Sequence, residues 1–194
     1  AWDLGYISTT QCLTRLERAF ESLQKLPRYR GHLFNWYDTQ SLVPLAPLYV
    51  STVDSGNLLG YLMTVKTALP AMIDEPPLID GRFQEGLLDT VELFERNAAA
   101  AMAGMGRDVA GGFRSDLRRL RAELEVPPAS AEAASKWLPT IADELAALAA
   151  RVHDAQDRTT TEAAQLASAG WWLDAAGLMV TERRRELAAM SKSP

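Results

Sequence analysis

The chain has 194 residues, 47% of them hydrophobic, and a formal net charge of −5. This length allows one or two domains with a well-formed core, and mild acidity with scattered basic residues argues against nucleic acid as the main partner. The single cysteine, Cys12, excludes an internal disulfide framework and a cysteine metal site. We therefore expect a reducing compartment, no metal and no cofactor. Charged residues interrupt every apolar stretch, so no membrane span is expected.

The first residues, Ala1-Trp2-Asp3, lack the basic region and apolar core of a signal peptide, and we expect a segment cut from a larger protein. A helix is predicted from about Thr9 to Leu26, ended by Pro27. Its apolar residues recur at steps of three and four, which places them on one helix face. They are Cys12, Leu13, Leu16, Phe20, Leu23 and Leu26.

Residues 28–59 differ from the rest of the chain because they combine aromatic, charged and amide side chains with two prolines and two glycines. Such a stretch cannot form one long helix. Short runs rich in aromatic and β-branched residues predict an irregular aromatic loop or short hairpin at about 28–54. Good N-cap residues then predict a helix from about Ser55 to Ala68, ended before Pro70.

The rest of the chain is rich in alanine and leucine, with helical periodicity. A linker at 74–81 carries the main break, which divides the chain into 1–73 and 74–194. Short joints between the later helices indicate an antiparallel bundle or two helical hairpins, so the predicted fold class is all-α. The four helices are predicted at about 82–105, 108–124, 131–155 and 160–190.

Several side chains in these helices carry separate expectations. Trp171 and Trp172 should point to different helix faces, one into the core and one outward. Residues 183–185, three arginines near the C-terminal end, suit the negative end of the helix dipole and are expected to be solvated. Pro139 should kink its helix unless the helix begins close to it. His153 is expected on the surface.

The mixture of side chains at 28–59 suits carbohydrate binding. A sugar ring has an apolar face that flat rings such as Trp36 and Tyr37 can cover. It also has a rim of hydroxyls that Asp, Asn, Arg and His side chains can hold through short hydrogen bonds. The opposing interpretation is a packing loop, because aromatic and proline residues over a helical bundle often seal its core.

The same stretch contains two acids and one histidine. Asp38 and Asp54 would suit acid and base roles in glycoside chemistry. A turn for Asp38 and a helix cap for Asp54 are favoured instead, because both are common uses of aspartate. His32 has no second imidazole or cysteine beside it, which argues against a metal site.

Two segments, 26–39 (LPRYRGHLFNWYDT) and 49–58 (YVSTVDSGNL), resemble a region of the bacterial cyclic β-1,2-glucan synthases. Residues 1–8 (AWDLGYIS) and the first helix resemble the part that precedes this region. The motifs are long and rich in uncommon residues, and the resemblance covers roughly the first 70 residues. Beyond them, only the pattern of an Ala/Leu-rich helical insertion is similar.

The resemblance implies a fold and a function. Those synthases are large inner-membrane proteins that build and cyclise β-1,2-linked glucose chains. The matching segment belongs to a glucoamylase-like region, an (α/α)6 toroid of paired helices associated with transglycosylation and ring closure. Residues 1–73 would be a partial glucoamylase-like segment and 74–194 a helical insertion, in a soluble part on the cytoplasmic side. The positions that would line or support the glucan cleft are Arg30, His32, Asn35, Trp36, Tyr37, Asp38, Asp54, Ser55 and Asn57.

By this resemblance we expect a glucan-binding part of the cyclisation region that is not catalytically complete alone, since the toroid needs more residues and the catalytic carboxylates lie further along. The expected partners are a β-1,2-glucan oligosaccharide and the remaining domains of the parent, without nucleic acid or membrane contact. An exposed cleft face also predicts self-association.

Two alternatives belong to other classes. In the first, residues 82–190 form a helical interaction or scaffold module that docks other domains of a large enzyme, and the loop is only packing. Exposure separates this from sugar binding, because a binding platform needs Trp36 accessible. In the second, the chain is a small glycosidase using Asp38 and Asp54, which would release reducing sugar by itself.

Overall fold

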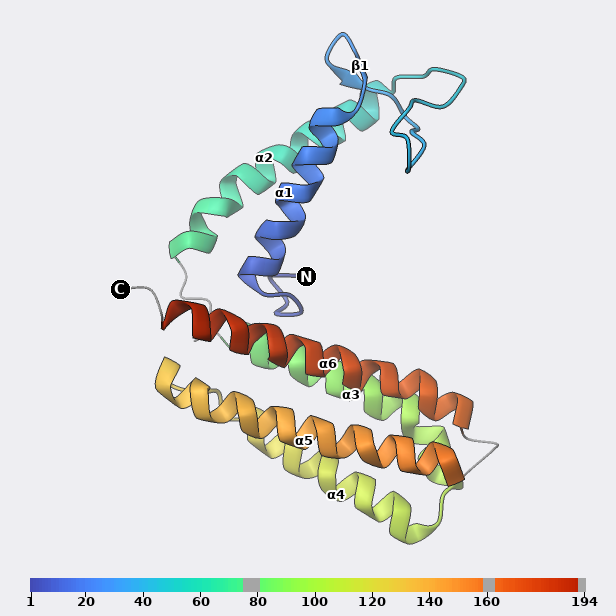
Figure 1. Ribbon diagram of the computed structural model, residues 1–194, viewed down its shortest axis with the longest axis vertical. Helices are drawn as coiled ribbons and strands as arrows, with labels where there is room; N and C mark the ends of the chain where they lie inside the picture. Colours follow the sequence, from blue (N-terminus) through green and yellow to red (C-terminus); the bar gives the residue numbers. More distant parts are fainter. Residues whose placement is uncertain (75–80, 159–162, 192–194) are drawn as a thin grey trace. The chain divides into compact units, whose positions relative to one another are not determined.

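The computed structural model describes residues 1–74, 81–158 and 163–191 (Figure 1). Over these residues it contains six helices and one two-stranded antiparallel sheet. This confirms the predicted all-α fold class with a short hairpin.

The chain divides into two compact units. We call Thr9–Pro76 the hairpin unit, and Ala1–Ser8 together with Pro77–Pro194 the bundle unit. The first eight residues thus lie with the later helices. The assignment of 1–73 to a glucoamylase-like segment and of 74–194 to an insertion stays a prediction.

Four long helices build the bundle unit. They are α3 (Arg82–Gly104), α4 (Arg107–Leu124), α5 (Ala131–Arg158) and α6 (Ala163–Met190). Helix α3 packs against α4 and α6, and α5 packs against the same two helices, so each helix has two neighbours (Figure 1). The predicted bundle is therefore confirmed. Gly106 lies between α3 and α4, and Pro127 and Pro128 lie between α4 and α5, since glycine and proline interrupt helices.

Apolar side chains at helical spacing form the core of the bundle. Leu87, Val91 and Phe94 of α3 are fully buried, and Trp172 packs partly buried against the same core. Its neighbour Trp171 is 60% exposed, as the two-face prediction required. Burial of each large apolar side chain contributes about 1.5–3 kcal/mol. The largest fully buried side chains are Phe94, Phe113, Leu87, Leu120, Leu124, Leu138, Ile141, Leu148, Leu166, Val91 and Val180.

Arg183 is buried, and the expectation that all three arginines at 183–185 are solvated is wrong for this one. Its position follows Ala176 and Val180 at helical spacing, so the turn of α6 carries it into the core. Its guanidinium lies 4.8 Å from the Phe83 ring centroid and 3.3 Å from a carboxylate oxygen of Glu186. A buried charge needs such partners, because desolvation alone is expensive.

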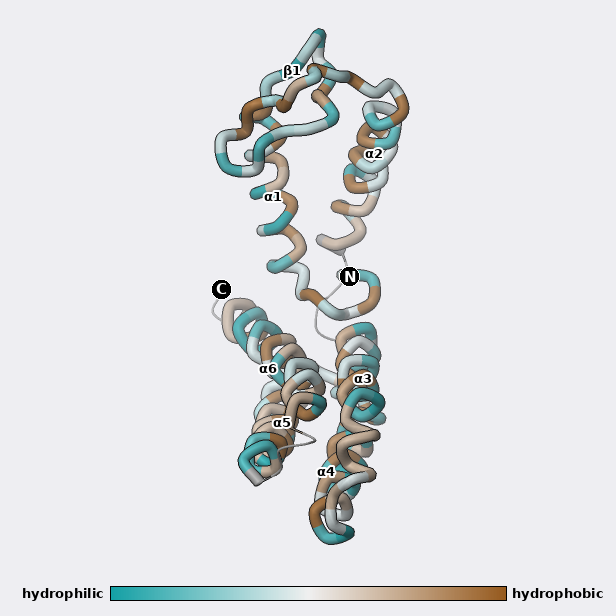
Figure 2. The backbone as a smooth tube through the Cα atoms, turned by 90° about the vertical axis from the view of Figure 1, so that its right-hand side faces the viewer, coloured by the Kyte–Doolittle hydropathy of each residue, from teal (hydrophilic) through white to brown (hydrophobic). Residues whose placement is uncertain are grey.

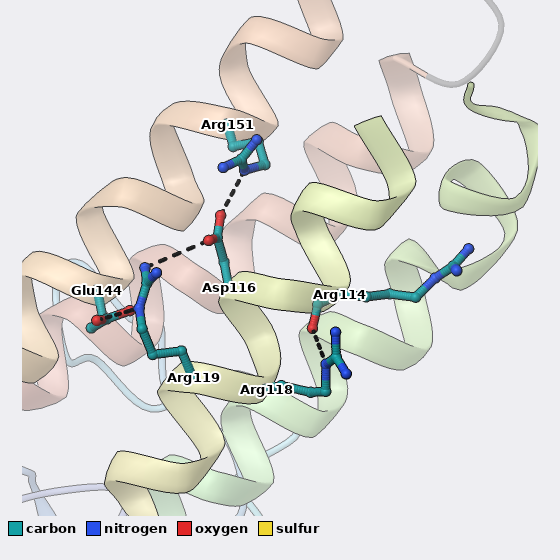
Figure 3. A network of polar contacts seen from close by, with 6 residues as sticks. All are labelled: Arg114, Asp116, Arg118, Arg119, Glu144 and Arg151. Carbon is teal, nitrogen blue, oxygen red and sulfur yellow. Dashed lines mark hydrogen bonds and ion pairs between the residues drawn. The ribbon is translucent and has the colours of Figure 1, made fainter. Parts of the chain in front are cut away.

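A network of ion pairs joins α4 to α5 (Figure 3). The largely buried Asp116 accepts a hydrogen bond from Arg151 Nε at 2.6 Å, and its other oxygen lies 3.5 Å from Arg119. Arg119 Nε also contacts both oxygens of Glu144, at 2.6 and 2.7 Å. This hydrogen bonding to Glu144 raises the pKa of the Arg119 guanidinium. The network links α4 to α5 at the edge of the core, between the partly exposed arginines and the largely buried carboxylates.

The segment Ala1–Ser8 packs onto the start of α3, where Gly5 and Gly86 allow a close approach of the two backbones. A Cβ on Gly86 would lie 2.5 Å from the Leu4 carbonyl oxygen, so only glycine allows this close approach. The Arg82 guanidinium lies 4.2 Å from the Trp2 ring centroid. The Tyr6 hydroxyl donates to Asp89 at 3.0 Å, and this bond raises the pKa of Tyr6.

The hairpin unit holds the remaining elements. They are α1 (Thr9–Lys25), β1 (Arg28–Tyr29), β2 (His32–Leu33) and α2 (Thr52–Asp74). Hydrophobic and hydrophilic residues alternate along α1 in Figure 2, as its apolar stripe requires, yet none of its residues is fully buried. Helix α2 exposes Tyr61 and Met63 by 72% and 62%. A helix that is apolar around much of its surface is typical of the interior of a larger domain.

Helix α2 departs from its prediction at both ends, since it begins at Thr52 and continues through Pro70 to Asp74. Ser51 caps it, because the Ser51 hydroxyl accepts a hydrogen bond from the Asp54 N–H at 3.1 Å. Within a helix, Pro70 removes one backbone donor but does not have to end it. Pro139 likewise lies inside α5. The predicted start of the last helix near 160 falls outside the described residues.

Candidate functional site

A cavity of about 380 Å³ lies within the hairpin unit, beside the first turns of α2. Small-molecule sites commonly have volumes of about 300–1,000 Å³. The lining includes both apolar and polar side chains, which suits a ligand with both kinds of surface. The lining residues are Leu23, Arg28, Gly31, His32, Leu33, Phe34, Asn35, Asp54, Ser55, Leu58, Leu59 and Leu62.

The hairpin β1–β2 supplies Arg28, Gly31, His32 and Leu33 to the cavity lining. Tyr29 pairs with His32 across a two-residue turn, in which Arg30 and Gly31 have φ values of 51° and 88°. Positive φ at both positions defines the turn type whose twist matches that of the two strands. The turn therefore places Arg30 at the tip, outside the cavity lining, with its guanidinium 5.4 Å from the Tyr29 ring centroid.

His32 follows this turn and reaches α2. Its Nδ1 lies 3.1 Å from the Ser55 hydroxyl oxygen, and that hydroxyl donates to the Ser51 carbonyl at 2.8 Å. The imidazole is thereby tied to the first turn of α2.

Asn35 makes a second tie between the loop and α2. Its Oδ1 accepts from the Ser51 backbone N–H at 2.9 Å, and its Nδ2 donates to Asp54 Oδ2 at 3.2 Å. The backbone donor fixes which way the amide points, because only the oxygen can accept. Asp54 lies in the first turn of α2, where a negative charge interacts favourably with the helix dipole.

Asp38 lies in a turn and not at the cavity. Its Oδ1 accepts hydrogen bonds from the Ser41 N–H at 2.6 Å, the Ser41 hydroxyl at 2.8 Å and the Gln40 N–H at 3.1 Å. These bonds, that from the Ser41 N–H foremost, hold the pKa of Asp38 below its ordinary value. The turn role favoured from the sequence is confirmed, whereas the cap of α2 is Ser51 and not Asp54.

The two aromatic candidates have different surroundings. Trp36 is 53% exposed and stacks on Tyr49, with ring centroids 6.3 Å apart and planes 28° from parallel. Tyr37 is half-buried, and its hydroxyl donates to the Pro27 carbonyl at 2.7 Å while accepting the Phe34 N–H at 2.8 Å. Tyr37 therefore braces the loop, and Trp36 offers an accessible ring.

Of the nine predicted positions, His32, Asn35, Asp54 and Ser55 line the cavity together. The other predicted positions are not among its lining residues; they are Arg30, Trp36, Tyr37, Asp38 and Asn57. The sequence interpretation missed Arg28, whose Nη2 donates to the Leu23 carbonyl near the end of α1 at 3.0 Å. It also missed the leucines of α2. Residues 54, 55, 58, 59 and 62 have the spacing of one helix face, a signal that a helix beginning at Thr52 makes visible.

Two further observations apply to the described part of the chain. There, no group of three or more His, Cys, Asp or Glu side chains is placed to hold a metal ion. Within the same residues, no helix has both the length and the apolar character needed to cross a membrane.

No family model matches the chain. Its sequence is similar to that of a cyclic glucan synthase, which supports a glucan synthase family and is consistent with a fragment of such an enzyme. This relative is the cyclic beta-(1,2)-glucan synthase NdvB of Rhizobium meliloti (strain 1021), 32% identical over 136 residues. The resemblance stated from the two sequence motifs is thereby confirmed.

The match covers 65% of this chain. This share is about 126 of the 194 residues, so the match extends beyond residues 1–73. Part of the bundle unit thus shares the similarity, beyond the first 70 residues to which the sequence motifs assigned it. The match covers only 5% of the length of the relative.

Proposed function

We propose that the hairpin unit binds a β-1,2-glucan chain as part of the cyclisation region of a cyclic glucan synthase. The observation that carries the proposal is the cavity of about 380 Å³, whose lining combines leucines with the polar side chains of His32, Asp54 and Arg28. A glucose ring presents an apolar face and a hydroxyl rim. A site with these two surfaces can hold both.

The chemistry of the lining supports recognition of hydroxyls. The Asp54 carboxylate accepts one hydrogen bond from Asn35, and a carboxylate has further acceptor positions. The Arg28 guanidinium donates once to Leu23 and carries further N–H donors. Hydrogen bonds between sugar hydroxyls and charged groups are short and strong. The cavity therefore combines an anionic acceptor with a cationic donor.

Trp36 supports a second contact with the same glucan chain. Trp36 stacks on Tyr49 and is exposed to solvent, and a flat ring of this kind can cover the apolar face of a sugar. The packing alternative requires a buried Trp36, whereas 53% of it is exposed. Trp36 and the cavity would bind different sugar units of one oligosaccharide.

The proposal assigns binding and not bond cleavage to this segment. Glycoside chemistry by a carboxylate pair needs one protonated and one ionised acid facing the same bond. Asp38 is held as a carboxylate by its turn, and Asp54 is the one carboxylate among the described residues that line the cavity. The remaining helices of an (α/α)6 toroid, which would cover α2, and the catalytic acids would belong to other parts of the parent.

The test is a calorimetric titration of the chain with β-1,2-glucooligosaccharides. We expect saturable binding that Trp36→Ala and Asp54→Asn each weaken, whereas Trp171→Ala, a substitution of an equally accessible ring in the bundle unit, leaves it unchanged. Asp54→Asn keeps one oxygen that can accept from Asn35, removes the charge and replaces the second acceptor oxygen by a donor. A dissociation constant of 1 mM corresponds to a binding free energy of about −4 kcal/mol. Absence of binding at millimolar sugar, or native affinity in both variants, would refute the proposal.

A second candidate function, docking of other domains of the parent, is favoured by one observation on α6. Trp171 and Leu178, seven residues apart and therefore on one helix face, are 60% and 65% exposed. Exposed apolar pairs of this kind often mark contact surfaces. If this face docks a neighbouring domain, Trp171→Ala with Leu178→Ser should make the intact parent more sensitive to limited proteolysis without changing glucan binding by the hairpin unit.

A further inference from the structure

The contacts of the Ser55 hydroxyl determine where the proton of the His32 ring lies. The hydroxyl oxygen lies 2.8 Å from the Ser51 carbonyl oxygen and 3.1 Å from His32 Nδ1. A hydroxyl has one proton to donate, and a carbonyl oxygen can only accept. If that proton pointed to the imidazole, two acceptor oxygens would face each other at 2.8 Å without a hydrogen between them.

One arrangement satisfies both contacts. The Ser55 hydroxyl donates a hydrogen bond to the Ser51 carbonyl oxygen, and His32 Nδ1 carries a hydrogen that it donates to the Ser55 oxygen. The serine oxygen then accepts from Nδ1–H while its own hydrogen is donated to the carbonyl. In a neutral imidazole the second nitrogen is then an acceptor, since the hydrogen bond made by one ring nitrogen sets the state of the other. His32 is one of the residues that line the cavity.

We propose that Ser55 is a positioning residue that holds His32 in the Nδ1–H tautomer, so that Nε2 accepts a hydrogen bond from a ligand hydroxyl. The identity of the ligand rests on the proposed glucan function; the tautomer does not. The His32 ring contacts the neutral hydroxyl of Ser55, whereas Asp54 accepts from Asn35 and Arg28 donates to Leu23. Ser55 is therefore the group that orients the ring.

With His32 in this tautomer, the polar residues of the lining offer different hydrogen-bonding groups to a sugar hydroxyl. Arg28 offers donors, the neutral His32 ring offers one acceptor, and Asp54 offers an anionic acceptor. A sugar hydroxyl is both donor and acceptor, and vicinal hydroxyls of one glucose unit can use both kinds of partner at once. In the other tautomer His32 would donate from Nε2, and the lining would lose its neutral acceptor.

The first experiment detects the tautomer directly. Long-range ¹H–¹⁵N correlation spectra of the full chain, recorded at a pH where the imidazoles are neutral, distinguish Nδ1–H from Nε2–H rings. The exposed His153 of α5, the second of the two histidines, serves as the internal reference, and His153→Gln assigns the signals. We expect the Nδ1–H pattern for His32 and its loss in Ser55→Ala. An Nε2–H pattern for His32 in the native chain would overturn the proposal.

The second experiment tests the role of Nε2 in binding. The amide nitrogen of Asn mimics Nδ1, and the amide of Gln reaches the position of Nε2. His32→Asn should therefore keep the tie to Ser55 but weaken glucan binding about 3- to 10-fold, the loss of one hydrogen bond, whereas His32→Gln should retain more affinity. Equal affinity of His32→Asn and the native chain would overturn the acceptor role. If the native chain binds no glucan, the proposed function fails, and the tautomer is still decided by the spectra.

Discussion

Gly112 of α4 makes room for the Arg151 side chain, and Gly112→Ala offers a sharp test of the α4–α5 network. A Cβ at this position would lie 2.7 Å from Arg151 Nη1 and 3.1 Å from Cζ. The guanidinium would have to move, and the 2.6 Å hydrogen bond from Arg151 Nε to Asp116 would be strained or lost (Figure 3). The neighbouring Gly111 has no atom within 4 Å of an added Cβ, so Gly111→Ala is a matched control.

Two effects of opposite sign act on the free energy of unfolding. Replacement of an exposed helical glycine by alanine stabilises a helix by about 0.5–1 kcal/mol, and we expect this for Gly111→Ala. At Gly112 the same gain opposes the loss of a charge-assisted hydrogen bond, about 1.5–3 kcal/mol, reduced because the Arg151 side chain is 41% exposed and screened by solvent. We expect Gly112→Ala to be about 1–2 kcal/mol less stable than Gly111→Ala.

Urea denaturation of the full chain, followed by far-ultraviolet circular dichroism, measures the difference between the two variants. A second background isolates the cause. With Arg151→Ala the obstacle and the ion pair are both absent, so Gly112→Ala should then stabilise the chain as Gly111→Ala does. If Gly112→Ala stabilises the native background by the same amount as Gly111→Ala, the network does not hold Arg151 against α4, and the reasoning is wrong.

Three further predictions concern other contacts. Gly86→Ala should lower the free energy of unfolding by about 1–2 kcal/mol, because its Cβ would displace the Leu4 carbonyl; Gly177→Ala on α6, where an added Cβ meets nothing within 4 Å, should not, and urea denaturation compares the two. The pKa of Tyr6 is raised, so its bond to Asp89 stabilises the fold below the unfolded pKa, and this contribution is lost as pH rises through the folded pKa. A spectrophotometric titration should find Tyr6 above about 10, and Asp89→Ala should lower it; an unchanged midpoint would contradict the assignment. The pKa of Asp38 is lowered, so its turn stabilises the fold above the unfolded pKa, and this contribution is lost as pH falls through the folded pKa. The Ser41 amide shift should therefore titrate with a midpoint below about 3.9 in an NMR pH series, and a midpoint at the ordinary value would refute the turn geometry.

The helices were predictable because their signals are local. The stripe of α3 with Leu87, Val91 and Phe94, and the proline and glycine breaks between helices, are readable within short windows of sequence. The errors at α2 have a local cause as well. Several residues from Ser51 to Ser55 are good caps, and the choice among them depends on which hydroxyl reaches the Asp54 N–H.

The sequence indicated the segment that supplies most of the cavity lining, but only some of the residues that line the cavity. Residues 28–59, where the uncommon polar and aromatic residues gather, supply all of the cavity lining except Leu23 and Leu62. Which of them face the cavity depends on pairings across 16 to 23 residues, such as Asn35 with Ser51 and His32 with Ser55. Composition does not encode such pairings, since Asp38 and Asp54 look alike in the sequence although one closes a turn and the other lines the cavity.

The sequence by itself determined the helical class, the bundle and the resemblance to the cyclic glucan synthases, because hydrophobic period, breakers and long motifs are properties of the chain alone. Only the tertiary structure decided that the Arg183 side chain is buried beside Phe83, that Arg28 lines the cavity, and that the Ser55 hydroxyl donates its hydrogen bond to the Ser51 carbonyl. These outcomes depend on which groups from distant positions compete for one partner in space. A hydrogen bond or buried charge is settled by that competition and not by the identity of the residue.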